Sequence, residues 1–154
     1  PVPIEHLPNR PTIEVIEPGP MRINGFDIDA LNLNHPGGSL AFRIRGLTGD
    51  LVYATDHEFG DPARDAALAD FSQGAAALIL DAHFTPDEIA SHRGWGHSDW
   101  RTCAEFAARA DVGGLWLFHH KPGRTDEELV GIASAARRIF RATEAAGERE
   151  ALQL

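Results

Sequence analysis

Imidazole and carboxylate side chains recur where the apolar, strand-like runs of this chain end. A hydrolytic metal site needs such groups to converge from distant points of the sequence, on loops that rigid strands hold in place. The groups present are too few to hold two metal ions, so the pattern predicts half of a metal site. Four short segments carry it: Asn34-His35-Pro36-Gly37-Gly38, Thr55-Asp56-His57-Glu58, Gly94-Trp95-Gly96-His97-Ser98 and Leu117-Phe118-His119-His120.

The length and the charge of the chain restrict its classes of function. Its 154 residues, 43% of them apolar, make one domain or a piece of a larger one, with enough length to bury a core. A formal net charge of -9 argues against a general nucleic-acid or anionic-membrane binder, because clustered Lys and Arg hold a phosphate backbone. A nucleotide or phosphodiester would therefore need metal ions to supply local positive charge.

Cysteine usage and the start of the chain give expectations about location. The single cysteine, Cys103, excludes an internal disulfide. No apolar run approaches the roughly 20 residues of a membrane helix, and nothing resembles a signal peptide, so we expect a cytoplasmic protein without membrane contact. The chain opens with Pro1-Val2-Pro3 rather than methionine, and we expect a processed or excised fragment.

The first part of the chain has the patterns of β-strands. A short β-branched run predicts a strand at 12–16, and apolar and polar residues alternate with a period of two over 26–34. Two further strands are predicted at 39–45 and 51–55. The segment between them, Gly46-Leu47-Thr48-Gly49-Asp50, has the glycines and the aspartate of a hairpin turn.

The hydrophobic period then changes to that of helices alternating with strands. Helical spacing of apolar residues predicts helices at 62–71 and 99–110, and acidic residues after Thr125 start a last helix, where the helix dipole favours them. Continuous apolar runs predict buried strands at 75–80 and 115–118. The fold class is therefore mixed α/β (α+β), a β-meander followed by β-α-β-α.

Three residues at strand ends are candidate metal ligands, although each has a simpler interpretation. His35 precedes a sharp turn that fixes its imidazole, yet a lone histidine there is more often structural. Asp56 is well placed to bridge two cations, but an aspartate after a strand is also a common turn former or helix cap. His119 could project into a site, whereas the period of two turns its neighbour His120 the other way.

The segment around His97 is the hardest to explain by packing alone. Two glycines and two tryptophans surround this histidine just before a helix that Ser98 or Asp99 can cap, a setting that suits an anion. The preceding strand ends at Asp81, which could orient His97 and hold it as an imidazolium that protonates a leaving group or contacts a phosphate. His97 and Asp81 are therefore the candidate catalytic residues.

Taken together, these segments resemble the C-terminal half of the metallo-β-lactamase superfamily, closest to its ribonuclease Z-like and phosphodiesterase-like branch. The resemblance covers residues 23 to 129. In that family a strand ending in His-Pro-Gly-Gly supplies a metal histidine, matching His35, and a strand followed by Thr-Asp supplies the bridging carboxylate, matching Asp56. A Gly-His-Ser/Thr segment opening a helix supplies a phosphate-contacting histidine, matching His97, and a Leu-x-His segment supplies the last ligand, matching His119.

The resemblance implies a metal-dependent hydrolase, and it favours a phosphodiesterase acting on a small phosphodiester or nucleotide. A hydroxide bridging two divalent ions would attack phosphorus, because metal binding lowers the pKa of water towards about 7. Zinc is the expected metal, while manganese or iron would also accept such ligands. The alternatives are a mononuclear iron oxygenase or a thioester hydrolase of the same fold, and a non-catalytic association module.

One departure from the family changes the expectation for the chain alone. The superfamily's His-x-His-x-Asp-His segment is absent, so each ion would have only two protein ligands where stable zinc sites want three or four. The chain would be one half of an αββα sandwich, inactive and without metal by itself. It would need its missing N-terminal half or a second chain, a homodimer included, to cover the sheet.

Other histidines are expected to lie away from the metal. We expect His57 and His120 not to bind it. Should a ligand have been overlooked, it would be sought among His6, His57, His83 and His92.

Overall fold

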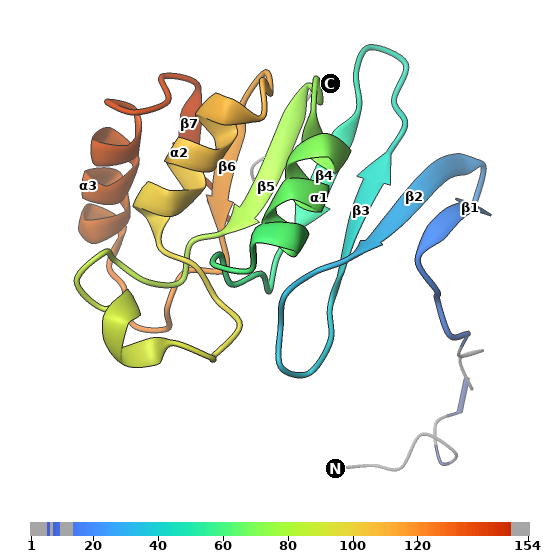
Figure 1. Cartoon of the computed structure of the whole chain (residues 1–154), viewed down its shortest axis with the longest axis horizontal. Helices are drawn as coiled ribbons and strands as arrows, with labels where there is room; N and C mark the ends of the chain where they lie inside the picture. Colours follow the sequence, from blue (N-terminus) through green and yellow to red (C-terminus); the bar gives the residue numbers. More distant parts are fainter. Residues whose placement is uncertain (1–5, 7, 10–13, 149–154) are drawn as a thin grey trace.

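The computed structural model describes residues 6, 8–9 and 14–148. Within these residues seven strands form one sheet, in which neighbours in space are also neighbours in sequence (Figure 1). The strands β1 to β4 pair antiparallel, and β4 to β7 pair parallel. Their bounds are Gly19–Ile23 for β1, Phe26–Asn32 for β2, Leu40–Ile44 for β3, Leu51–Ala54 for β4, Ala77–Asp81 for β5, Leu115–Phe118 for β6 and Thr143–Ala145 for β7.

The first strand lies further along the chain than the sequence pattern indicated. Of the predicted strand 12–16, residues 12 and 13 lie outside the described part, and 14–16 form no strand. β1 instead pairs with β2 through a turn at Asn24 and Gly25, whose φ angles are 50° and 88°. An Asn-Gly pair accepts two positive φ values and so matches the twist of a two-residue hairpin. This turn, rather than β-branched composition, decides where the first strand ends and how it pairs with β2.

In the part of the chain that the structure describes, three α-helices cover the sheet: α1 (Pro62–Ser72), α2 (Trp100–Arg109) and α3 (Asp126–Ala136). Their starts follow from capping, because Asp61, Asp99 and Thr125 each accept hydrogen bonds from backbone N–H groups of the first turn. Figure 1 shows α1 and α2 in front of the sheet and α3 beside β7. A short 3-10 helix, η2 (Ile89–His92), lies in the loop between β5 and α2.

The two faces of the sheet differ in burial. Alternate residues of the central strands, such as Val52, Leu80 and Leu117, are at most 1% exposed beneath the helices. On the other face, paired positions place four apolar side chains in one row across the sheet, and all four are only partly buried. No helix of the described residues covers that row, which consists of Phe42, Tyr53, Ile79 and Trp116.

The mixed α/β fold class and the order of elements through α3 agree with the sequence patterns, and apart from β1 the bounds differ by at most two residues. β7 was not predicted. It has three residues, of which only Thr143 is buried, so it offers no alternation to recognise. No described helix has both the length and the apolar character needed to cross a membrane.

Candidate metal centre

The candidate site lies where three parallel strands end. Asp56 follows β4, Asp81 is the last residue of β5, and His119 follows β6. Because parallel strands bring their carboxyl ends to one edge of a sheet, these three residues meet there although they are far apart in sequence. Asp56 and His119 have φ angles of 60° and 51°, so the backbone turns sharply at both positions as it leaves its strand.

Four side chains converge at this edge. Asp56, Asp81, His97 and His119 each offer one ligand atom, and these atoms all lie within 4.8 Å of one another. His119 Nδ1 lies 2.8 Å from Asp56 Oδ1 and 3.5 Å from Asp81 Oδ2. His97 Nδ1 lies 3.6 Å from Asp56 Oδ1. The arrangement supplies two carboxylates and two imidazoles, a donor set that first-row divalent metals accept.

One oxygen in the cluster fits a cation better than a protein partner. Asp56 Oδ1 is shielded from solvent, and no described residue makes a hydrogen bond to it. His119 Nδ1 approaches it closely without the geometry of a hydrogen bond. A buried carboxylate oxygen without a hydrogen bond is costly, and a metal ion bound between Asp56 and His119 would satisfy both of them.

Asp81 and His97 form a close pair beside this cluster. Asp81 Oδ2 lies 2.5 Å from His97 Nδ1, and the Asp81 side chain is fully buried. Its other oxygen, Oδ1, accepts the backbone N–H of His83 at 3.0 Å. A carboxylate held in this way favours the proton on Nδ1 of His97, which leaves Nε2 available for a ligand or a reacting oxygen.

His83 also lies in the site, although the sequence analysis named it only as one of four histidines among which an overlooked ligand would be sought. It forms a second group of possible metal ligands with His97 and His119, and its ring stacks on that of His97 with centroids 4.6 Å apart. Its Nδ1 lies 3.0 Å from the carbonyl oxygen of His119, to which it can donate. Burial lowers the pKa of His83 and favours the neutral ring. Its position two residues after Asp81 was the sequence signal that could have indicated that both side chains lie on the same side of the strand end.

His35 lies near the cluster but is not part of either ligand group. Its ring centroid is 5.7 Å from that of His97, and its Nδ1 accepts the backbone N–H of Gly37 at 3.1 Å. The ring also packs tightly on Gly96, where an added Cβ would come within 2.0 Å of His35 Cδ2. His35 therefore reaches the edge of the site through the β2–β3 loop.

The remaining histidines have other surroundings. His57 is 1% exposed, accepts the backbone N–H of Asn34 on Nδ1, and has its Nε2 3.1 Å from Asp65 Oδ1. Burial lowers the pKa of His57 and also that of His120, and neither residue joins the described ligand groups. His92 stacks on Phe84, with ring centroids 4.4 Å apart.

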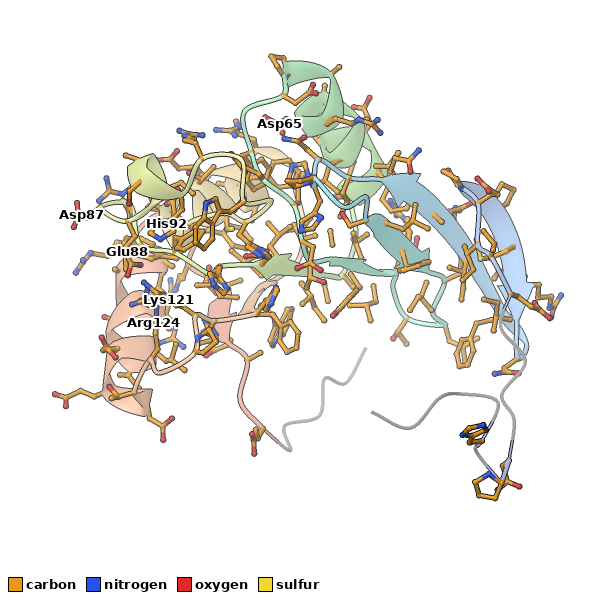
Figure 2. The ribbon with its side chains drawn as sticks, turned by 90° about the horizontal axis from the view of Figure 1, so that it is seen from below. Asp65, Asp87, Glu88, His92, Lys121 and Arg124 are labelled. Atoms are coloured by element: carbon orange, nitrogen blue, oxygen red, sulfur yellow. The ribbon has the colours of Figure 1, made fainter. Side chains whose placement is uncertain are left out.

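An ion cluster ties together the two loops that carry His83 and His119. Figure 2 shows Glu88, Lys121 and Arg124 gathered between the loop after β5 and the start of α3. Glu88 pairs with Lys121 at 3.0 Å and more closely with Arg124. Partial burial would raise the pKa of Glu88, but hydrogen bonds from Thr85, Lys121 and Arg124 outweigh it and lower the pKa to about 2.

Comparison with known proteins identifies the family of this chain. The Ribonuclease Z of Bradyrhizobium sp. (strain ORS 278) is 33% identical over 93 residues, which make up 60% of this chain and 30% of that protein. The crystal structure of the metallo-beta-lactamase fold protein YhfI from Bacillus subtilis superposes with a TM-score of 0.72 and 23% identity, covering 87% of this chain and 52% of that one. Human tRNase Z, short form, gives a TM-score of 0.59 with 17% identity, over 84% of this chain and 44% of that one.

The matches cover most of this chain but a smaller share of each similar protein. This chain spans less than a third of the Ribonuclease Z and about half of each of the two solved structures. The family described as the beta-lactamase superfamily domain matches residues 2–120, which is more than half of the chain. The chain therefore belongs to the beta-lactamase superfamily domain family.

Proposed function

We propose that this chain is the C-terminal part of a metal-dependent phosphodiesterase that acts on a small phosphodiester or a nucleotide. The observation that carries the proposal is Asp56 Oδ1, which accepts no hydrogen bond from the described residues and faces His119 Nδ1 at 2.8 Å within a cluster of four possible ligands. The ribonuclease Z relatives support phosphodiester chemistry, and the net charge of -9 favours a small substrate over a long polynucleotide.

The residues of the chain have distinct roles in this proposal. Asp56 and His119 would hold divalent ions, and His35 would approach them from the β2–β3 loop. A bound divalent cation supplies Lewis acidity and lowers the pKa of water. His97 would stabilise the phosphoryl oxygens or give a proton to the leaving oxygen, and Asp81 would fix the orientation and the tautomer of its ring.

The donor set of this chain is incomplete for two metal ions, and one face of its sheet has no cover among the described residues. We propose that an N-terminal half or a second chain supplies both the missing ligands and the cover. The row of Phe42, Tyr53, Ile79 and Trp116 would be the contact, because apolar residues of two facing sheets interdigitate. Phe118, 41% exposed, extends this surface.

The test uses the full-length protein and measures metal content and turnover together. After dialysis against a chelator, we expect about two zinc, manganese or iron ions per site to rebind and to restore hydrolysis of bis(p-nitrophenyl) phosphate. A variant at the remote capping residue, Glu128→Gln, should behave as the unmodified protein does. One bound iron with oxygen consumption, hydrolysis of thioesters alone, or no metal at all would each contradict the proposal.

A further inference from the structure

A buried carboxylate without a cationic partner lies two residues after Asp56. Glu58 is 9% exposed, and no Lys or Arg side chain of the described residues forms an ion pair with it. Its oxygens accept backbone hydrogen bonds instead. The N–H of Gly94 lies 2.9 Å from both oxygens, and the N–H of Gly96 lies 2.8 Å from Oε2.

The glycine segment is shaped to hold this carboxylate. Gly94 and Gly96 have φ angles of 83° and 86°, a conformation in which alternate N–H groups can line a concave site for an anion. Hydrogen bonds to a charged acceptor are stronger than neutral ones, and they offset part of the penalty of burying the charge. Glu58 is thus an internal anion bound by the main chain, and capping or ion pairing does not account for it.

The same segment carries His97 and touches the metal centre. Gly96 directly precedes His97 and packs on the ring of His35, with no space for a side chain. Ser98, on the other side of His97, donates its hydroxyl to the carbonyl oxygen of His57 at 2.5 Å. The backbone on both sides of His97 is therefore tied to the loop that follows β4 and carries Asp56.

We propose that Glu58 is a positioning residue, which sets His97 against Asp81 and beside Asp56 by binding the backbone of Gly94 and Gly96. The proposal rests on the proposed function only in assigning His97 a part in the reaction. Loss of the carboxylate would leave the N–H groups of Gly94 and Gly96 without acceptors, and the backbone of this segment would change its conformation. His97 would then lose its fixed distance to Asp81, while Asp56 and His119 would keep theirs.

The first measurement needs no activity. In the full-length protein, amide hydrogen exchange and the imidazole proton of His97 are followed by NMR in the unmodified protein, Glu58→Gln and Glu58→Ala. We expect exchange at Gly94 and Gly96 to become faster in Glu58→Ala, and the proton shared by His97 and Asp81 to broaden or disappear. Glu58→Gln keeps one acceptor oxygen and should lie between the two.

The second measurement is a double-mutant cycle on turnover of an activated phosphodiester. We expect Glu58→Ala to lower kcat by about 100-fold with unchanged KM and metal content, because a misplacement of about 1 Å has an effect of that size. In a His97→Ala background the same change should have no further effect, since its action passes through His97. Glu128→Ala, which removes a carboxylate that accepts the N–H of Thr125, is the matched control and should leave kcat unchanged.

Several outcomes would overturn the proposal. Unchanged exchange at Gly94 and Gly96, or an unchanged His97 proton, would show that Glu58 does not position this segment. Metal loss in Glu58→Gln would mean that Glu58 acts on the metal ligands. A further loss of turnover in the His97→Ala background would mean that Glu58 does not act through His97. If no phosphodiester is hydrolysed, the proposed function fails and the NMR result still decides the role of Glu58.

Discussion

The antiparallel and parallel halves of the sheet differ in where the ends of their successive strands lie. In the antiparallel half, β1 to β3 alternate in direction, so the ends of successive strands lie at opposite edges. In the parallel half, β4 to β6 deliver Asp56, Asp81 and His119 to one edge. β2 runs in the same direction as β4, which brings His35 to that edge as well. Strand direction therefore decides which polar side chains can meet.

The largest effect is expected when a proposed metal ligand at the end of a parallel strand is removed. Asp56→Asn keeps the shape of the side chain and removes its charge, so metal and activity should be lost together. We expect metal affinity to fall by more than about 100-fold, because even the loss of an outer partner weakens binding by 10- to 100-fold. Elemental analysis and turnover in the full-length protein measure both.

The antiparallel half provides the comparison for this result. Asp29, a residue of β2, forms an ion pair with Arg45 at 2.8 Å. It belongs to neither of the described groups of possible ligands. Asp29→Asn should therefore leave metal content and kcat unchanged. Equal metal loss in both variants would mean that the acidic charge of the chain, rather than the convergence of strand ends, holds the ions.

The second-largest effect tests whether His97 acts in the reaction rather than as a metal ligand. If His97 serves the transition state, His97→Ala should keep its metal while kcat falls by roughly 100- to 10,000-fold, the usual range for losing a general acid or base. Metal content and turnover are again the measurements. Loss of metal would make His97 a ligand, and full turnover would make it structural.

A third prediction compares the stability of the two halves. Leu80 on β5 is 1% exposed and belongs to the hydrophobic core, whereas Ile28 on β2 is only partly buried. We expect Leu80→Ala to lower the free energy of unfolding by about 2–5 kcal/mol, the range for large-to-small changes in a core. Ile28→Ala should lower it by less. Denaturant titrations of the two variants compare them, and an equal loss would show that the antiparallel half is buried by a partner.

The smallest effect concerns pH and the ion cluster of Glu88. Its pKa is lowered from 4.5 to about 2 in the folded chain, so its contribution to stability is present above about pH 4.5 and disappears as the pH falls towards 2. Partial exposure to solvent screens the pairs and keeps the effect modest. The difference in unfolding free energy between the unmodified protein and Glu88→Gln should shrink over that interval. A difference that stays constant with pH would contradict the assignment.

The sequence was informative where local rules decide the structure. Capping residues and hydrophobic periods predicted the helices and the central strands, because Asp99 and Thr125 fix helix starts through their immediate neighbours. The resemblance to a family predicted a common site for Asp56, His97 and His119, whereas Asp81 was predicted as a partner of His97 from its position at the end of a strand. Their relative distances depend on sheet order, which no short segment contains.

What the sequence did not reveal depends on contacts between distant loops. Glu58 appeared as one more acidic residue after a strand, and its hydrogen bonds to Gly94 and Gly96 span 36 and 38 positions. His83 was recognised only as a possible omission, because its role follows from stacking on His97. β7 was missed because three residues carry no periodicity.

The positive φ angles of Asp56 and His119 restrict what natural variation can place there. Glycine adopts this conformation readily, asparagine, aspartate and histidine adopt it more often than other residues do, and a β-branched residue would strain the backbone. If Asp56 is a metal ligand, a relative that has lost the metal is expected to carry Asn or Gly at position 56, rather than Val or Thr. A search for inactive relatives can use this as a filter, since the backbone conformation would persist after the proposed ligand had been replaced.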